Sequence, residues 1–255
     1  MAETGQAEFI GNIKKALRRP DSDTRSLKDI IREKPGSDDL RLLDKIRNRD
    51  RNMRLDLLDR IIENGKLLNM VVIAEKDTAS VAASIVKIAA GKNSEWGEKK
   101  SVIAWDHPLV KSLALSNRLE PLNIPVYFPG AMTGNDREAK FRAHAESALI
   151  GITSADYCIA ETATITMKSR VGQLRCVSLL PSIHIVVIRL EQILSNLKEL
   201  YALLKWDADE QVEGLTDCLT FITGPSKTAD IEATLVQGAH GPKELYLFVL
   251  NDCAV

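Results

Sequence analysis

Three stretches in the second half of the chain combine carboxylates, hydroxyls and imidazoles, groups that form hydrogen bonds and transfer protons. The first is GITSADYCIAET, in which Glu161 and Thr162 directly follow an apolar run. Ligands of open α/β sheets bind at the carboxyl ends of strands, so Glu161 is a candidate general base or nucleophile, with Thr162 beside it as a ligand-binding residue. The alternative is a turn carboxylate that accepts hydrogen bonds from backbone amides.

The second stretch, ITGPSKTADIEATLV, contains Thr223, Gly224, Ser226, Asp230 and Glu232. A strand is predicted to end at Thr223 and a helix to begin near Lys227. Free backbone amides at such a helix start can hold a phosphate or a carboxylate, which makes the turn a candidate ligand site. The alternative is plain helix capping by Ser226, with the two carboxylates favouring the N-terminal end of the helix dipole.

The third stretch is QGAHGP, where His240 lies beside Gly241. A histidine on such a flexible segment can act as an acid or base, or orient a carboxylate. His184 in PSIHIVVI is its candidate companion. Because His184 lies in an apolar strand, a core histidine with satisfied hydrogen bonds is the alternative.

Cationic side chains surround a glycine in KSRVGQLR, where Lys168, Arg170 and Arg175 flank Gly172. Arginine forks bind carboxylates in two-pronged geometry, so Arg175 is a candidate anion ligand. The alternative is that these cationic side chains are solvated on the surface of a hairpin.

The chain lacks the usual frameworks for metals and nucleotides. Its four cysteines form no C-x-x-C pair, and no local cluster of histidines and carboxylates is visible. Neither G-x-G-x-x-G nor the phosphate-loop pattern occurs. We therefore expect no metal and no cofactor on this chain, and any redox metal on a partner protein.

Charge and hydropathy limit the partners further. The 255 residues carry a formal net charge of -1, so no overall field attracts nucleic acid or an anionic membrane. No run approaches the roughly 20 apolar residues that a membrane-spanning helix needs. We expect a cytoplasmic protein without a membrane span.

The elements that must position these residues form an α/β pattern. Residues 1–36 are predicted as a helical arm and linker, and residues 37–255 as one α/β domain. An amphipathic helix from Leu40 to Ile62 is interrupted by RNRDRNM, and its arginines, Arg49 among them, are predicted to face solvent. Three strand–helix units follow after Gly65, and they predict a parallel sheet covered by helices.

Closely spaced strands are predicted from Tyr157 onward: YCIA, ATITM, CVSLLP and IHIVVI. They indicate a small antiparallel sheet joined to the parallel one. A helix from Leu190 to Leu204, a strand LTFIT, a helix from about Lys227 and a final strand ELYLFVL complete the prediction.

Taken together, GITSADYCIAET, VGQLRCVSLLPSIHIVVI and ITGPSKTADIEATLVQGAHGPKELYLFVL resemble the LUD (lactate utilisation) domain family, in particular its C-subunit or YkgG type. The resemblance runs from about Leu58 to Leu250, and its motif positions include Gly151, Thr153, Glu161, Thr162, Arg175, Ser178, His184, Thr223, Gly224, Ser226, Asp230, Glu232, His240 and Gly241. The family usually has glycine where this chain has Ala163.

The resemblance implies a three-layer sandwich similar to the NagB/RpiA/CoA-transferase-like fold. It also implies a subunit of a system that oxidises L-lactate to pyruvate with iron–sulfur partner proteins, and a small carboxylate as ligand. Two alternatives stay open: a non-catalytic scaffold or ligand sensor, and a free-standing isomerase or CoA transferase that uses Glu161. A homo-oligomer is not excluded.

Overall fold

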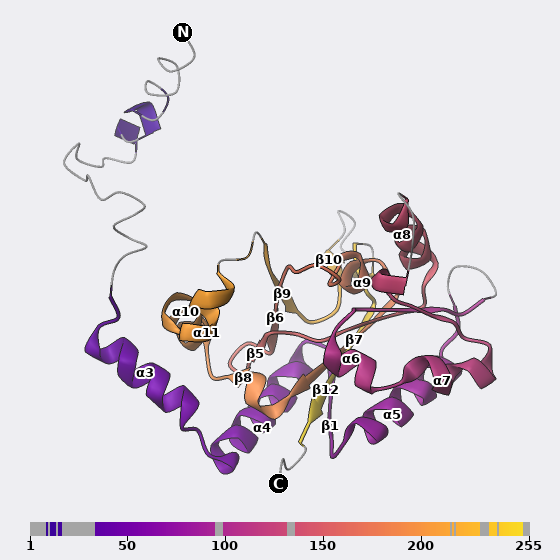
Figure 1. The fold of residues 1–255 in the computed structure, drawn as a ribbon, viewed down its shortest axis with the longest axis horizontal. Coiled ribbons are helices and arrows are strands. Elements are labelled where there is room, and N and C mark those ends of the chain that lie inside the picture. Colours follow the sequence, from indigo (N-terminus) through magenta and orange to yellow (C-terminus); the bar gives the residue numbers. More distant parts are fainter. Residues whose placement is uncertain are drawn as a thin grey trace. The chain divides into compact units, whose positions relative to one another are not determined.

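The computed structural model describes residues 9, 11–13, 15–16, 34–94, 99–131, 136–214, 216, 218–229, 235–238 and 240–251 (Figure 1). The chain divides into two compact units, Met1–Leu40 and Arg41–Val255. In the first unit, residues 9, 11–13 and 15–16 are helical, and helix α3 (Ser37–Arg47) begins there. The boundary after residue 36 stays a prediction.

A six-stranded sheet forms the centre of the second unit, with the strand order β1-β12-β7-β4-β2-β3. The strands are β1 (Met70–Glu75), β12 (Glu244–Leu250), β7 (Ile183–Arg189), β4 (Ile150–Thr153), β2 (Val102–Ala104) and β3 (Val126–Tyr127). All five neighbouring pairs are parallel. The inner strands carry aliphatic residues on both faces, as parallel sheets covered by helices require.

Helices cover both faces of this sheet. One face packs against α5 (Thr78–Gly91), α6 (Pro108–Ser112) and α7 (Leu115–Leu119). The other packs against α4 (Arg51–Leu67), α8 (Arg137–Ser147) and α9 (Cys176–Leu179). Short 3-10 turns lie at Glu120–Leu122, Pro129–Ala131 and Leu190–Gln192. The predicted strand–helix units are thus confirmed, as is the break between α3 and α4, where Asp50 caps α4 by accepting a 2.8 Å hydrogen bond from the Met53 amide.

A smaller mixed sheet packs on the α4 side, in the order β8-β5-β6-β9. Its strands are β8 (Ile193–Leu194), β5 (Tyr157–Ile159), β6 (Thr164–Lys168) and β9 (Leu219–Thr223). The pairs β5–β6 and β6–β9 are antiparallel, as predicted, whereas β5–β8 is parallel. Helices α10 (Leu197–Trp206) and α11 (Ala208–Glu213) follow β8, and α10 packs against β5 and β8.

Two predicted elements were wrong around the long strand β7. The run CVSLLP is not a strand, because its amides bond locally, as in Val177 to the Leu174 carbonyl at 3.2 Å and Leu180 to the Cys176 carbonyl at 3.0 Å. The helix predicted from Leu190 begins only at Leu197. Residues 193–194 pair with β5 instead, and Asn196 caps the helix by accepting from the Glu199 amide.

The helix predicted from Lys227 was also wrong. Strands β10 (Lys227–Ala229) and β11 (Leu235–Gln237) pair there as an antiparallel hairpin. Thr228 lies opposite Val236, and such β-branched residues favour extended backbone. Asp230 and Glu232, the two carboxylates expected at the start of that helix, lie outside the described residues.

Strand β4 was missed, because the preceding helix was predicted to run through Ile150. The helix ends at Ser147, and β4 is then buried at all four positions. Gly151 in its middle lies so close to α9 that a Cβ atom there would overlap the carbonyl oxygen of Val177. The glycine therefore sets the distance between helix and sheet.

Arg49 was wrongly predicted to face solvent. Its side chain is 7% exposed and donates a 2.6 Å hydrogen bond to Glu199, whose side chain is 3% exposed. The other carboxylate oxygen of Glu199 accepts from the Ser195 amide at 2.7 Å. This ion pair joins the turn before α4 to α10.

Within the described residues, no helix has the length and apolar composition needed to cross a membrane.

Candidate functional site

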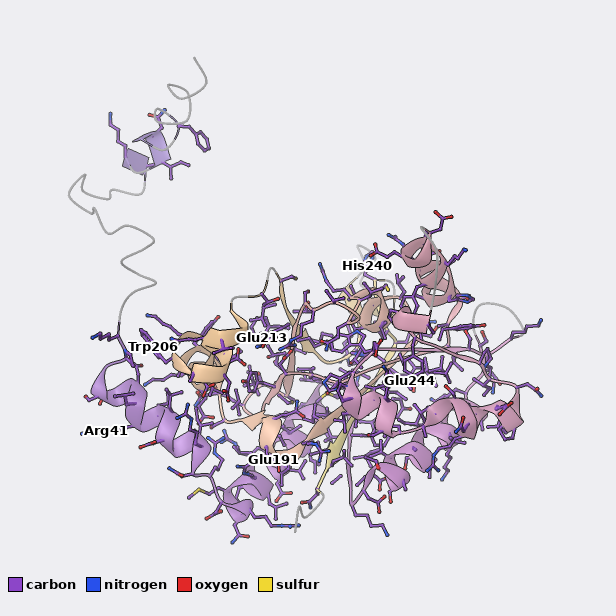
Figure 2. The ribbon with its side chains drawn as sticks, in the orientation of Figure 1. Arg41, Glu191, Trp206, Glu213, His240 and Glu244 are labelled. Carbon is purple, nitrogen blue, oxygen red and sulfur yellow. The ribbon has the colours of Figure 1, made fainter. Side chains whose placement is uncertain are left out.

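A cavity of about 220 Å³ lies where α9, the end of β9 and the segment before β12 meet the amino ends of β7 and β12. Its lining consists of Ser178, Leu179, His184, Phe221, Ile222, Thr223, Gly224, Pro225, Ser226, His240, Gly241, Pro242 and Leu245. His240, labelled in Figure 2, is exposed on the segment that leads into β12. Six residues predicted from separate stretches, His184, Thr223, Gly224, Ser226, His240 and Gly241, therefore meet at one cavity.

The turn from Thr223 to Ser226 joins two strands and is not the start of a helix. The Ser226 amide donates to the Pro242 carbonyl at 2.8 Å, and the Ser226 carbonyl accepts from the Gly238 amide at 3.0 Å. The predicted set of free amides is therefore wrong at Ser226. Gly224 has φ 77°, and a Cβ atom there would lie 3.1 Å from the Leu68 carbonyl oxygen, so the turn depends on glycine.

His184 is the most buried polar group of the cavity, at 1% exposure. Its Nε2 lies 2.9 Å from the Thr153 hydroxyl oxygen on the neighbouring strand β4. Its Nδ1 is buried and has no hydrogen-bond partner among the described residues. Burial lowers the pKa of the ring to about 3, so the imidazole is neutral at physiological pH.

The neutral state of His184 predicts a stability change with pH. The folded pKa of about 3 lies below the ordinary value of 6.5, so the unfolded chain binds the proton more readily. Stability is therefore full above pH 6.5 and is lost as the pH falls from 6.5 towards 3, by at most about 1.4 kcal/mol per pH unit. Urea unfolding at pH 7, 6 and 5 measures this slope.

Replacing His184 with glutamine removes this titrating group, so the stability of His184→Gln should fall less steeply with acid than that of the original protein. Equal slopes in the two proteins would contradict the assignment, whatever their absolute stabilities.

Glu161 and Thr162 lie on the exposed turn between β5 and β6 and do not line the cavity. The backbone of this turn is fixed, since the Glu161 amide donates to the Ser195 carbonyl at 3.0 Å and its carbonyl accepts from Asn64 at 3.1 Å. Ala163 adopts φ 45° at 0% exposure, so this turn has a left-handed residue that is not glycine.

A row of hydroxyl groups connects this turn to the cavity. The Thr162 hydroxyl donates to that of Thr164 at 2.8 Å, and Thr164 shares a 2.7 Å hydrogen bond with Thr223. Thr164 and Thr223 face each other across β6 and β9. Glu161 is therefore the chain neighbour of Thr162, where this row of hydroxyl groups begins, but it does not itself line the cavity.

The cationic loop does not form an anion clamp at the cavity. Lys168 is buried and bonds Glu210 and Glu213 at 2.6 Å each, while Arg170 bonds Asp156 at 2.6 Å and also contacts Glu213 (labelled in Figure 2). These two cations are thus neutralised by carboxylates. Arg175 is exposed at the residue before α9 and is not part of the cavity wall.

The chemistry of the cavity follows from its lining. None of the described lining residues is Lys, Arg, Asp or Glu, so hydroxyls, imidazoles and backbone groups are the available partners. Sequence reasoning gave no role to Ser178 or Thr153, although both are motif positions. In the pairing of β4 with β7, Gly151 lies opposite His184. Thr153 lies two residues after Gly151 and therefore on the same face of β4. This alternation of side chains along a strand could have pointed to Thr153 from the sequence.

The described part of the chain holds no group of three or more His, Cys, Asp or Glu side chains suited to a metal ion.

A helix-covered parallel sheet, with a mixed sheet packed on one side and a cavity at their junction, defines an α/β protein with a small-molecule-sized site. The family model described as LUD domain matches residues 58–250, and the chain belongs to that family. The resemblance inferred from the motifs is therefore confirmed.

The chain is similar to proteins of several bacteria. Lactate utilization protein C of Halalkalibacterium halodurans is 34% identical over 153 residues, covering 60% of this chain and 64% of that protein. Its namesake in Shouchella clausii is 31% identical over 180 residues, covering 69% and 73%. Uncharacterized protein YkgG of Escherichia coli is 32% identical over 160 residues, covering 62% and 66%. The match to the Halalkalibacterium protein thus spans less than two thirds of its length.

A solved structure supports the fold. The crystal structure of a DUF162 family protein from Deinococcus radiodurans aligns with a TM-score of 0.51 and 21% identity, covering 78% of this chain and 98% of that one. At this identity the likeness concerns the fold alone.

Proposed function

We propose that this chain is a subunit of a cytoplasmic system that oxidises L-lactate to pyruvate, and that it binds a small carboxylate in the cavity beside His184. The observation that carries the proposal is membership of the LUD domain family over residues 58–250, together with relatives named lactate utilization protein C. The fold by itself supports no particular activity.

The cavity supports the ligand part of the proposal. At roughly 30 Å³ for each water-sized group, about 220 Å³ accommodates about seven such groups, which suffices for the six heavy atoms of lactate or pyruvate. The hydroxyls of Thr223 and Ser226 can donate to a carboxylate. His240, exposed at the cavity, offers a further ring nitrogen for a hydrogen bond.

The redox part of the proposal falls to partner proteins. Oxidation of lactate removes two electrons and two protons, and hydroxyls and imidazoles take up protons only. Iron–sulfur subunits are proposed as the electron carriers, and this chain as the subunit that holds the acid. An isomerase or CoA-transferase role would rest on the resemblance to the NagB/RpiA/CoA-transferase-like fold alone.

Reconstitution tests the proposal. The full chain is combined with iron–sulfur proteins of a lactate-oxidising system, and reduction of an artificial electron acceptor is measured with L-lactate. We expect rates at least tenfold lower without this chain. Equal rates with and without it would contradict a role in lactate oxidation.

Glu161 enters the proposal as an acid–base group on the neighbouring turn and needs its own test. In the reconstituted system Glu161→Gln should lower the rate tenfold or more, the scale of general acid–base catalysis, without changing the fold. Because the Glu161 side chain is exposed, the melting temperature of the variant should stay within about 2–4 °C of that of the original protein. A change of 1 kcal/mol in stability produces a shift of this size in a domain of this length. Glu120→Gln, on the surface beyond β2, is the matched control. An unchanged rate in Glu161→Gln would contradict an acid–base role for Glu161.

A further inference from the structure

Nδ1 of His184, which has no hydrogen-bond partner among the described residues, points to a specific chemical group on the ligand. A buried polar atom without a partner costs free energy, and native proteins rarely leave one in place. This atom belongs to a ring that lines a cavity of about 220 Å³, and Thr153 holds the opposite side of the ring at 2.9 Å. The position of the ring is thus fixed by the protein, while one of its two nitrogens has no partner among the described residues.

The neutral ring carries a single proton, which either nitrogen can hold. When the Thr153 hydroxyl donates to Nε2, the proton lies on Nδ1, which is then a donor. When Nε2 donates to the Thr153 oxygen, Nδ1 is an acceptor. A threonine hydroxyl rotates freely enough to serve in both arrangements. Nδ1 of His184 can therefore pair with an alcohol or with a ketone.

We propose that Nδ1 of His184 hydrogen-bonds the oxygen on C2 of a 2-hydroxy or 2-oxo acid, and that it thereby distinguishes these acids from unsubstituted carboxylic acids. This inference rests on the proposed function, since it assigns a recognition residue within the same site. In one tautomer Nδ1 accepts a hydrogen bond from the hydroxyl group of lactate. In the other tautomer Nδ1 donates a hydrogen bond to the oxo group of pyruvate. No proton leaves the ring, and no bond of the ligand is broken.

A neutral imidazole is suited to this uncharged oxygen. The carboxylate of the same ligand is left to Thr223, at the end of β9, and Ser226, on the turn that follows. A site that prefers an oxygen on C2 binds both lactate and pyruvate, the substrate and the product of lactate oxidation. A subunit that holds the acid throughout this two-electron step must bind both. Propionate, which has the same carbon chain without the oxygen, is the discriminating ligand.

Calorimetric titration of the full chain with L-lactate, pyruvate and propionate tests the inference. Lactate and pyruvate should each bind about 3–10-fold more tightly than propionate, the value of one neutral hydrogen bond. His184→Gln keeps an amide within reach of Thr153 and removes Nδ1. In this variant lactate affinity should fall to that of propionate, and propionate affinity should not change. His144→Gln, on α8 and outside this cavity, is the matched control.

The outcomes separate the two levels of the proposal. Absence of saturable binding for all three acids would contradict the carboxylate site of the proposed function. Equal affinities for lactate and propionate in the original protein would leave a carboxylate site and overturn the role of His184. The ligand series on the original protein decides this even if His184→Gln fails to fold. Nitrogen-15 spectra of the labelled imidazole should also show Nδ1 as an acceptor with lactate and as a donor with pyruvate.

Discussion

Gly151→Ala is expected to destabilise the protein by about 3 kcal/mol, the upper end of what overpacking costs in a close-packed core. The new Cβ atom would overlap the Val177 carbonyl oxygen and lie 2.9 Å from Cγ of Pro181. The obstacle is backbone, so no change of rotamer relieves it, and α9 must move away from β4. Thermal unfolding should show a melting temperature lower by roughly 6–12 °C.

Gly91→Ala provides the matched control for this variant. Gly91 ends α5, and a Cβ atom there meets nothing within 4 Å. The same chemical change should therefore be neutral or slightly stabilising, since alanine is the better helix former. If Gly151→Ala melted within about 2 °C of the original protein, α9 would not rest on β4 as the structure has it.

Glu199→Gln is expected to cost about 3–5 kcal/mol, because it leaves the guanidinium of Arg49 buried without its counter-charge. Both side chains are less than a tenth exposed and are joined at 2.6 Å. The size and shape of the side chain are retained in glutamine, so the loss measures the charge. Urea unfolding at pH 7 gives the free energy of unfolding directly.

Two comparisons make the test of the ion pair specific. Glu146→Gln breaks the exposed pair between Arg142 and Glu146 on α8, which should cost no more than about 0.5 kcal/mol. The double variant Arg49→Met with Glu199→Leu should recover most of the loss, because no charge then stays buried alone. A loss as large in Glu146→Gln as in Glu199→Gln would show that burial is not the cause.

Local pattern was sufficient to predict the fold where each element carries its own signal. The strands β1 and β12 are uninterrupted apolar runs, and α5 follows a capping aspartate, Asp77, with small and aliphatic residues at helical spacing. The prediction was wrong at the hairpin β10–β11 because KTADIEATLV carries helix-favouring residues. The strand pairing there depends on hydrogen bonds of Ser226 with Gly238 and Pro242, which lie far along the chain. Tertiary contacts there override local propensity.

The candidate site could be predicted in part for the same reason. Histidines and glycines in unusual surroundings, such as His184, His240 and Gly224, are visible in the sequence, and the structure brings them to one cavity. Whether Glu161 acts with them stays a prediction. The burial of Arg49 could not be predicted, because its partner Glu199 lies 150 residues away along the chain. A charge appears solvated in a local window until its distant partner is known.

The position of β12 has a consequence for how the protein is made. This strand is the last in chain order, yet it lies between β1 and β7 and supplies the parallel partner of β1. While the ribosome is still translating the preceding residues, β1 has no strand to pair with, since β12 is its neighbour in the sheet, and its apolar side chains are exposed to other nascent chains. The unit can close only after residue 250 has left the exit tunnel. Chaperone demand during synthesis should therefore persist until that point, and truncation before Glu244 should yield an aggregation-prone product and not a smaller folded domain.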